Sequence, residues 1–206
     1  TDVDAVHPGY GFLSENPNFV RELNKNKIIF IGPSESAIIS MGDKIKSKMI
    51  AEKASVNVVP GFIGEINNVN HAKEISKKIG FPVIVKASAG GGGKGMRIVN
   101  SEEDVEEAFL RASSEAKNSF GDERLFVEKY LVEPRHIEIQ IIADNYGNVV
   151  SLGERECSIQ RRNQKVIEEA PSSFLDEMLR RDMSTQAIML AKDVEYSSAG
   201  TGEFIV

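Results

Sequence analysis

The feature that most constrains the fold is a run of four glycines between two short apolar segments. The glycines occupy residues 90–93, and the flanking segments, 81–85 and 96–99, each have the length and apolar content of a buried strand. Two strands joined by so short a glycine-rich loop are typical of a β-hairpin. Consecutive glycines cost conformational entropy and add no side-chain packing, so we infer that the loop requires bare backbone.

The usual requirement for bare backbone in such a loop is the close approach of N–H groups to phosphate oxygens. Lys86, at the end of the first strand, and Lys94, in the loop, add positive charge beside this backbone. We therefore interpret the hairpin as a lid over the phosphates of ATP, with a flexible surface hairpin as the alternative. The spacing matches neither the P-loop pattern nor the Rossmann dinucleotide fingerprint, so neither is inferred.

Composition excludes several classes of protein. Hydrophobic residues make up 41% of the 206 residues, which is enough for a sizeable core. The net charge of −6 argues against a general nucleic-acid binder, although a local basic pocket can still bind ATP. The single cysteine, Cys157, excludes an internal disulfide. No apolar run approaches the roughly 18 residues that span a membrane, and no signal or transit peptide is recognised.

The first quarter of the chain is predicted to alternate strands with helices. A strand end, a helix, an apolar strand and one or two helices broken near Gly42 are expected over residues 3–6, 18–24, 28–31 and 34–54. A strand, a helix and a strand in this order favour a parallel α/β unit. We assign Lys46 and Lys48, in the last of these helices, to a solvated helix face.

Two later helices have recognisable start signals. Asn70 is expected to cap a helix over residues 71–79. Ser101 with Asp104 forms a predicted capping box for a long helix over residues 102–120. The remaining predicted elements are strands over 125–131, 135–141, 149–152 and 203–206 and an amphipathic helix over 176–194.

Residues 154–165 are the most unusual segment chemically. They are rich in charged side chains, and neither a helix period nor a strand period organises them. A surface loop of this polarity would more often contain Gly, Pro or Ser, so we favour a role in a site over a plain surface loop. Cys157 lies among these charges, where an exposed thiol is conceivable. Because no histidine lies near it in sequence, we interpret it as a bystander and not as a nucleophile.

Several motifs together resemble the biotin carboxylase component of biotin-dependent carboxylases, a branch of the ATP-grasp ligases. The resemblance runs from end to end of the chain. It rests on the glycine run, Lys86 and segments 7–16, 41–44, 128–130, 134–138, 160–165 and 168–171. Within the family, segments 87–90, 161–164 and 196–201 are most similar to the α subunits of propionyl-CoA carboxylases. Gly202 departs from the bulkier residue expected before the strand glutamate.

The resemblance implies an incomplete ATP-grasp fold of the α+β and α/β class, with the tail of an N-terminal α/β domain. The implied parts are a remnant of that domain, a helical linker, the ATP-grasp lid and the start of the C-terminal ATP-grasp subdomain, over residues 1–33, 34–58, 59–130 and 131–206. It also implies a two-step reaction. ATP phosphorylates bicarbonate to carboxyphosphate, and the CO₂ released from it carboxylates N1′ of biotin on a carrier domain. The implied cofactors are ATP, Mg²⁺ or Mn²⁺, and biotin.

The resemblance also implies roles for individual residues. The residues implied to contact the ATP phosphates are Lys44, Lys86, Gly92 and Gly93. The residues implied to hold adenine are Glu128, Lys129 and Leu131, and those implied to lie near the nucleotide are His136, Gln160 and Asn163. Many relatives carry His at the position of Asn163. Lys165 matches the lysine that binds bicarbonate, and Glu203 matches a nucleotide-proximal Mg²⁺ ligand, a hard carboxylate suited to that ion.

The implied partners are a biotin carboxyl carrier domain and a carboxyltransferase subunit or domain in an oligomer, with no nucleic acid and no membrane. The subfamily implies the mitochondrial matrix, and otherwise the cytoplasm. Three further functional residues of the family would follow Val206: a second metal-binding Glu, the general base Glu and an Arg that stabilises the biotin enolate. We therefore expect the isolated 206-residue chain to be inactive. The alternatives are another bicarbonate-activating ATP-grasp ligase, such as carbamoyl phosphate synthetase, and an ATP-binding module without chemistry.

Overall fold

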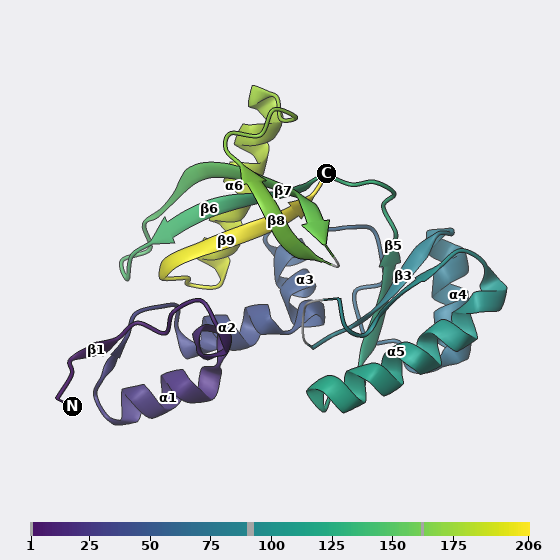
Figure 1. The fold of residues 1–206 in the computed structure, drawn as a ribbon, viewed down its shortest axis with the longest axis horizontal. Coiled ribbons are helices and arrows are strands. Elements are labelled where there is room, and N and C mark those ends of the chain that lie inside the picture. Colours follow the sequence, from purple (N-terminus) through teal and green to yellow (C-terminus); the bar gives the residue numbers. More distant parts are fainter. Residues whose placement is uncertain (1, 90–92, 162) are drawn as a thin grey trace.

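The computed structural model describes residues 2–89, 93–161 and 163–206, and these build three separate β-sheets with helices packed against them (Figure 1). The sheets have two, three and four strands, in the orders β1-β2, β4-β3-β5 and β8-β7-β6-β9. This mixed α and β architecture is the fold class expected from the sequence. None of the helices in the described ranges is long and apolar enough to cross a membrane.

The N-terminal part is a small parallel unit. Strands β1 (Ala5–Val6) and β2 (Ile29–Phe30) pair in parallel, and α1 (Pro17–Lys25) connects them after the 3₁₀ turn η1 (Phe12–Glu15). The predicted strand–helix–strand order is therefore confirmed. The Asn16 side chain caps α1 by accepting the amide N–H groups of Asn18 and Phe19.

Two helices follow, as the expected break near Gly42 indicated. They are α2 (Glu35–Gly42) and α3 (Lys44–Lys53). The break falls at Asp43, whose backbone is extended and whose carboxylate accepts the N–H groups of Ile45 and Lys46. Asp43 is therefore the N-cap of α3, which begins at the next residue, Lys44.

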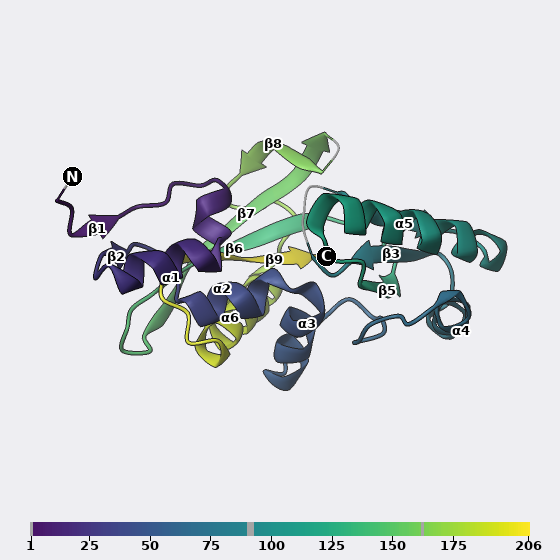
Figure 2. The ribbon, with the colours of Figure 1, turned by 90° about the horizontal axis from the view of Figure 1, so that it is seen from below.

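The middle of the chain forms the hairpin sheet. Strands β3 (Val83–Ala87) and β4 (Met96–Val99) are antiparallel, as predicted, and β5 (Leu125–Lys129) pairs with the other edge of β3. Helices α4 (Val69–Ile79) and α5 (Val105–Phe120) cover one face, as Figure 2 shows from below. The buried core between them includes Val83, Val85, Leu125, Val127, Ala72, Ala112 and Ala116.

Both helix starts in this region differ from the prediction. Asn68, and not Asn70, caps α4, because its side chain accepts the N–H of His71 at 3.0 Å. Helix α5 begins at Val105, after a 3₁₀ turn, η2 (Glu102–Asp104). The Ser101 hydroxyl donates to the Asp104 carboxylate at 3.1 Å and makes no cap hydrogen bond to the backbone, so the predicted capping box does not form.

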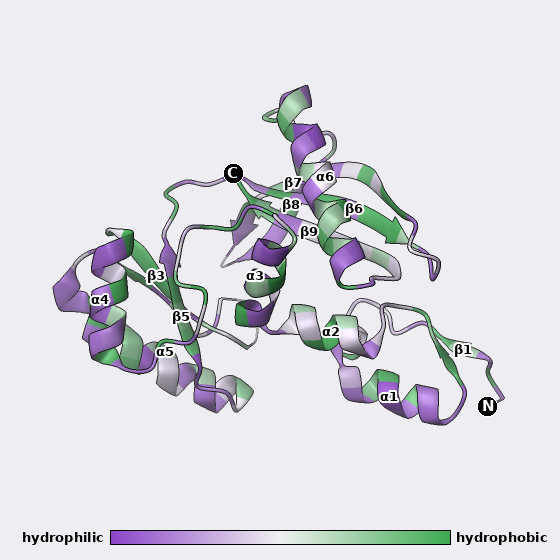
Figure 3. Cartoon of the chain, turned by 180° about the vertical axis from the view of Figure 1, so that it is seen from behind, coloured by the Kyte–Doolittle hydropathy of each residue, from purple (hydrophilic) through white to green (hydrophobic). Residues whose placement is uncertain are grey.

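The C-terminal part is a four-stranded antiparallel sheet made of β6 (His136–Ala143), β7 (Val149–Arg161), β8 (Gln164–Glu169) and β9 (Ser198–Ile205). Helix α6 (Glu177–Asp193) packs against it. Its core joins β6 to α6 through Ile137, Ile139, Met183 and Ala187. Figure 3 shows β6 largely in the green of hydrophobic residues.

Residues 154–165 show no strand period in the sequence, yet the structure places most of them in strands. Most of it belongs to β7, and β8 begins at Gln164. Glu154 and Glu156 are buried at 6% exposure each, whereas the intervening Arg155 is half-buried. The strand thus carries charged side chains on both faces, so the alternation of apolar and polar residues that identifies a strand is missing.

Candidate active site

The first cluster of charges lies on the face of the hairpin sheet that is opposite its apolar core. Alternation along β5 puts Leu125 and Val127 into the core and turns Phe126 and Glu128 the other way. Glu128 is only 5% exposed, yet its two oxygens have partners of opposite charge. Lys86 lies 2.9 Å from Oε1 and Lys48 lies 2.5 Å from Oε2.

This pairing sets the ionisation of Glu128. Burial opposes the charge, but the ammonium groups of Lys86 and Lys48 outweigh it and lower the pKa of the carboxyl. Lys48 had been assigned to a solvated helix face, and this assignment is wrong. Its side chain is 16% exposed, and it also donates to the carbonyl of Val59 at 3.2 Å. Helix periodicity could not reveal its partner, because Glu128 is distant in sequence.

Lys44 lies beside Lys86. Burial, and then the positive charge of Lys86, lower the pKa of Lys44. The backbone around it is fixed to the hairpin sheet, because the N–H of Lys44 donates to the carbonyl of Ser88 at 3.1 Å. The buried Ser88 hydroxyl donates to Asp43 at 2.9 Å, and Arg124 pairs with the same carboxylate at 3.0 Å. The helix α3 start that carries Lys44 is therefore tied to the end of β3.

The predicted adenine strand ends at Lys129. The Lys129 ammonium group donates to the carbonyls of Gly80 and Phe81 at 2.9 and 3.0 Å. The amide N–H of Lys129 donates to the carbonyl of Pro60 at 2.7 Å and is therefore already used. An adenine base that binds to the main chain here would donate its hydrogen bond to the Lys129 carbonyl. Leu131 follows, half-buried, outside the strand.

The second cluster lies on the C-terminal sheet and is centred on Lys165. Its ammonium group donates to Glu203 at 2.8 Å and forms a short hydrogen bond with Glu138. Strand register brings the carboxylates together, because Glu138 of β6 stands opposite Glu203 of β9 and Arg155 of β7. Arg155 donates to Glu138 at 2.6 Å, so this carboxylate, 3% exposed, has two cationic partners.

The charges of this cluster stabilise one another. Burial works against the Lys165 ammonium group, but the hydrogen bonds to Glu138 and Glu203 outweigh it and raise the pKa of Lys165. Burial likewise opposes the charge of Glu138, and the bonds from Lys165 and Arg155 hold the pKa of its carboxyl low. Lys165 is therefore fully protonated at neutral pH.

His136 and Gln160 flank Glu203. The Gln160 amide lies 3.0 Å from Nδ1 of His136 and donates to the carbonyl of Cys157 at 2.9 Å. Nε2 of His136 is 3.6 Å from Glu203, an ion-pair distance and not a hydrogen bond. His136 and Lys165 together lower the pKa of Glu203 to about 2.

The ligand atoms of His136, Glu138 and Glu203 lie within 4.8 Å of one another. As a three-residue cage this set does not suit Mg²⁺, since the Lys165 ammonium group contacts both carboxylates and imidazole is a poor ligand for that ion. Glu203 taken singly fits better, because its side chain is 54% exposed and Mg²⁺ commonly combines one or two carboxylates with phosphates and water.

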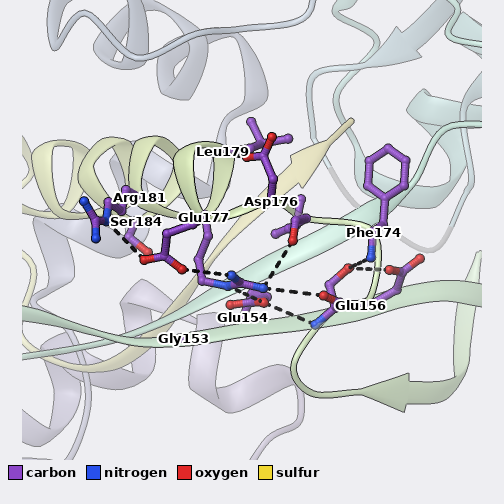
Figure 4. A network of polar contacts seen from close by, with 12 residues as sticks. Gly153, Glu154, Glu156, Phe174, Asp176, Glu177, Leu179, Arg181 and Ser184 are labelled. Carbon is purple, nitrogen blue, oxygen red and sulfur yellow. Dashed lines mark hydrogen bonds and ion pairs between the residues drawn. The ribbon is translucent and has the colours of Figure 1, made fainter.

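A polar network joins β7 to the start of α6 and to the segment before it (Figure 4). Glu154 accepts hydrogen bonds from Arg180 at 2.9 Å and from the N–H of Ser172 at 3.2 Å. Glu156 accepts the Ser172 hydroxyl at 2.6 Å and pairs with Arg135 at 2.9 Å. This network attaches the segment before α6 to β7, the strand that carries Arg155 and Gln160.

Gly93, at the end of the glycine run, lies against Asn163, which stands between β7 and β8. Gly93 has a φ of +80°, and a Cβ placed on it would collide with the amide of Asn163. Asn163, in turn, lies two residues before Lys165. The predicted glycine loop and the predicted bicarbonate lysine thus belong to adjoining segments. Gly92 lies outside the described residues.

Two cavities lie away from the charged clusters. These cavities, of about 460 and 330 Å³, are lined by residues around β2 and by residues around Asp43. Among the described residues that line them, neither Glu128 nor Lys165 is found.

Cys157 is fully buried, and burial, with the nearby Glu138, raises the pKa of its thiol to about 11. An inert thiol of this kind fits the bystander interpretation.

Family models match nearly the whole chain. Residues 43–206 match the model described as "Carbamoyl-phosphate synthase L chain, ATP binding domain", and residues 1–38 match "Biotin carboxylase, N-terminal domain". The second match separates the two bicarbonate-activating groups that the sequence left open. The chain belongs to the biotin carboxylase family.

Individual proteins agree with this membership. The biotin carboxylase chain is 59% identical over its whole length to the propionyl-CoA carboxylase alpha chain of Ruegeria pomeroyi, of which it spans 30%. It matches 46% of the crystal structure of a biotin carboxylase complex with β-γ-ATP from Campylobacter jejuni, at 52% identity and a TM-score of 0.96 over 98% of this chain. It also matches 45% of the biotin carboxylase domain dimer of the Hydrogenobacter thermophilus 2-oxoglutarate carboxylase, at 50% identity and a TM-score of 0.94 over 98% of this chain. That dimer is in complex with MgADP, ADP and bicarbonate.

Sequence reasoning missed Lys48, Glu138 and Arg155 as members of the charged clusters. A strand signal existed for Glu138, since residues 135–141 alternate polar and apolar side chains. Arg155 and Lys48 had no such signal, because their partners come from other strands or helices. Whether Lys44, Lys129 and the other predicted residues contact a nucleotide stays a prediction.

Proposed function

We propose that this chain carries the nucleotide and bicarbonate sites of an ATP-dependent biotin carboxylase, the first half-reaction of an acyl-CoA carboxylase. The observation that carries the proposal is the placement of Lys165. Its ammonium group is held between Glu138 and Glu203. Asn163, two residues earlier in the chain, lies against Gly93 of the glycine loop. A permanent cation at that point suits an anionic one-carbon substrate beside a triphosphate.

The chemistry requires mainly positioning and charge neutralisation. A bicarbonate oxygen attacks the γ-phosphorus of ATP, the bond from that phosphorus to the ADP oxygen breaks, and carboxyphosphate forms. The bond from the carboxyl carbon to the phosphate oxygen then breaks and gives CO₂ and phosphate. The CO₂ bonds to N1′ of biotin, and the proton of that nitrogen passes to the released phosphate. In this chain, Lys44 and Lys86 would neutralise phosphate charge, and the backbone of Gly93 would close over it. Lys165 would orient bicarbonate. A bound Mg²⁺, with Glu203 as one ligand, would add charge neutralisation at the phosphates.

We base the proposed acyl acceptor and the proposed partners on the subfamily resemblance. Similarity to a propionyl-CoA carboxylase alpha chain supports propionyl-CoA as the acyl acceptor, with a biotin carboxyl carrier domain and a carboxyltransferase as partners in an oligomer. Animal relatives carry the word mitochondrial in their names, whereas Ruegeria pomeroyi is a bacterium. We therefore propose the mitochondrial matrix for a eukaryotic source of this chain and the cytoplasm for a bacterial one.

The test is bicarbonate-dependent ATP cleavage with free biotin, measured on the full-length protein that carries this chain. Lys165→Met should lower turnover by about 100-fold or more, since one positioned charge commonly contributes that much. ADP affinity should change by less than about threefold, because Lys165 belongs to the second cluster. Turnover that needs ammonia in place of biotin would instead indicate carbamoyl phosphate synthesis, and ATP binding without turnover would indicate a binding module.

A further inference from the structure

The first charged cluster contains one more lysine than the proposed contacts require. Glu128 has one ammonium group on each oxygen, Lys86 at 2.9 Å and Lys48 at 2.5 Å. Both ammonium groups also lie over the same ring, at 5.7 and 5.6 Å from the centroid of Phe126. The two lysines come from different elements, β3 and α3, and both pair with one buried carboxylate.

The proposed function gives Lys86 and Glu128 conflicting tasks. Lys86 is assigned to the ATP phosphates, and Glu128 to the amino group of adenine. In the structure Lys86 is paired with Glu128, so it has to leave this carboxylate, at least in part, when phosphate arrives. If Lys86 were the sole partner, its departure would leave a buried anion without a counter-charge, which is strongly unfavourable.

Lys48 removes this conflict. It remains on Oε2 of Glu128 and is anchored by a second hydrogen bond, to the carbonyl of Val59 at 3.2 Å. Its side chain is 16% exposed, less than the 23% of Lys86, so Lys86 is the more accessible of the two. A carboxylate has about four lone-pair sites, so Glu128 can keep Lys48 and still accept a base amino group.

We propose that Lys48 is a positioning residue for ATP. It keeps Glu128 ionised and fixed, so that Lys86 can exchange its carboxylate partner for a phosphate. Lys48 itself touches neither phosphate nor base. The inference deepens the proposed function and rests on it.

The test compares a ligand that has phosphates with one that has none. ATP and adenosine are each titrated against bound mant-ADP on the full-length protein. Lys48→Met should weaken ATP binding by about tenfold, because Lys86 stays on Glu128, and should weaken adenosine binding by less than about threefold. Lys48→Arg keeps a cation on Oε2 and should bind ATP within about threefold of the wild type. The matched control is Lys46→Met, which removes an equal charge from an exposed position on the same helix and should change neither affinity.

A double variant separates positioning from a merely structural role. In Lys48→Met with Glu128→Gln, the neutral amide no longer holds Lys86, so ATP affinity should recover relative to Lys48→Met. Equal loss of ATP and adenosine binding in Lys48→Met, or no recovery in the double variant, would overturn the inference and leave the proposed function standing. A wild-type protein that binds no adenine nucleotide would overturn both.

Discussion

Gly93 and Asn163 approach each other so closely that a single methyl group on the glycine would overlap the asparagine amide. The two residues lie 70 positions apart, in the loop of one hairpin and the turn of another. The contact explains why bare backbone is needed at this glycine, besides its φ of +80°. The contact also links the end of the glycine run to Asn163, two residues before Lys165.

Replacement of Gly93 by alanine should therefore impair the site more than the fold. We expect Gly93→Ala to lower ATP affinity by about tenfold or more, measured by nucleotide titration. Left-handed backbone strain should cost about 1 kcal/mol of unfolding free energy. The matched control is Gly147→Ala, at φ +86° with nothing within 4 Å of its Cβ, which should cost similar stability and leave ATP affinity unchanged. Equal effects of the two variants on ATP affinity would contradict this account.

The sequence was sufficient to predict the elements with a local signal. The hairpin around the glycine run, the parallel N-terminal unit and the helix break near Gly42 all follow from apolar periodicity and turn residues, and the structure confirms them. Helix starts were less predictable, since Asn68 and Asn70 are both competent caps, and only the fold of the preceding loop decides between them.

Strand β7 and Lys48 could not be predicted, for a common physical reason. Glu154 and Glu156 are buried because arginines and hydroxyl groups from other segments satisfy them, and Lys48 is buried because Glu128 does. Buried charge depends on partners that only the tertiary structure supplies, whereas hydropathy patterns assign it to solvent.

Arg180 of α6, which pairs with Glu154 of β7, provides a test of this buried network. Arg180→Met removes the cationic partner of Glu154, whose side chain is 2% exposed, and should lower the unfolding free energy clearly more than a surface substitution does, because a buried charge loses its partner. Arg181→Met is the matched control. Its side chain is 77% exposed and pairs along the helix with Glu177, so the substitution should cost less than about 0.5 kcal/mol. Urea unfolding measures both, and a small effect of Arg180→Met would show that Glu154 is stable without it.

The depressed pKa of Glu203 predicts a pH dependence of stability. In the folded chain its pKa is about 2, against 4.5 in the unfolded chain, because His136 and Lys165 stabilise the carboxylate. The stabilisation is therefore complete above pH 4.5 and is lost as the pH falls towards 2. Glu203→Gln should lower stability by less than about 1 kcal/mol near pH 6, since the side chain is half exposed, and the difference from the wild type should vanish near pH 2. A difference that persists at pH 2 in urea unfolding would exclude ionisation as its cause.

The role of Glu138 can be separated from that of its neighbours by a matched pair of variants. Glu138→Gln removes a carboxylate that contacts both Lys165 and Arg155, whereas Glu168→Gln removes one that lies 3.6 Å from Arg155 and forms no ion pair with Lys165 among the described residues. We expect Glu138→Gln to raise the bicarbonate KM by about tenfold, with ATP affinity within about threefold, because Lys165 loses one of the two anions that orient it.

The same variant tests whether Glu138 orients Lys165 or keeps it charged. Without Glu138, Lys165 still has its hydrogen bond to Glu203, which raises the pKa of the ammonium group above that of a free lysine, so Lys165 stays protonated from about pH 7 to pH 9. The raised bicarbonate KM of Glu138→Gln should therefore run parallel to the KM of the wild type and of Glu168→Gln over that range. A KM that rises with pH in Glu138→Gln alone would mean that Glu138 is needed to keep the ammonium group charged, and a raised KM in Glu168→Gln would implicate Arg155 instead.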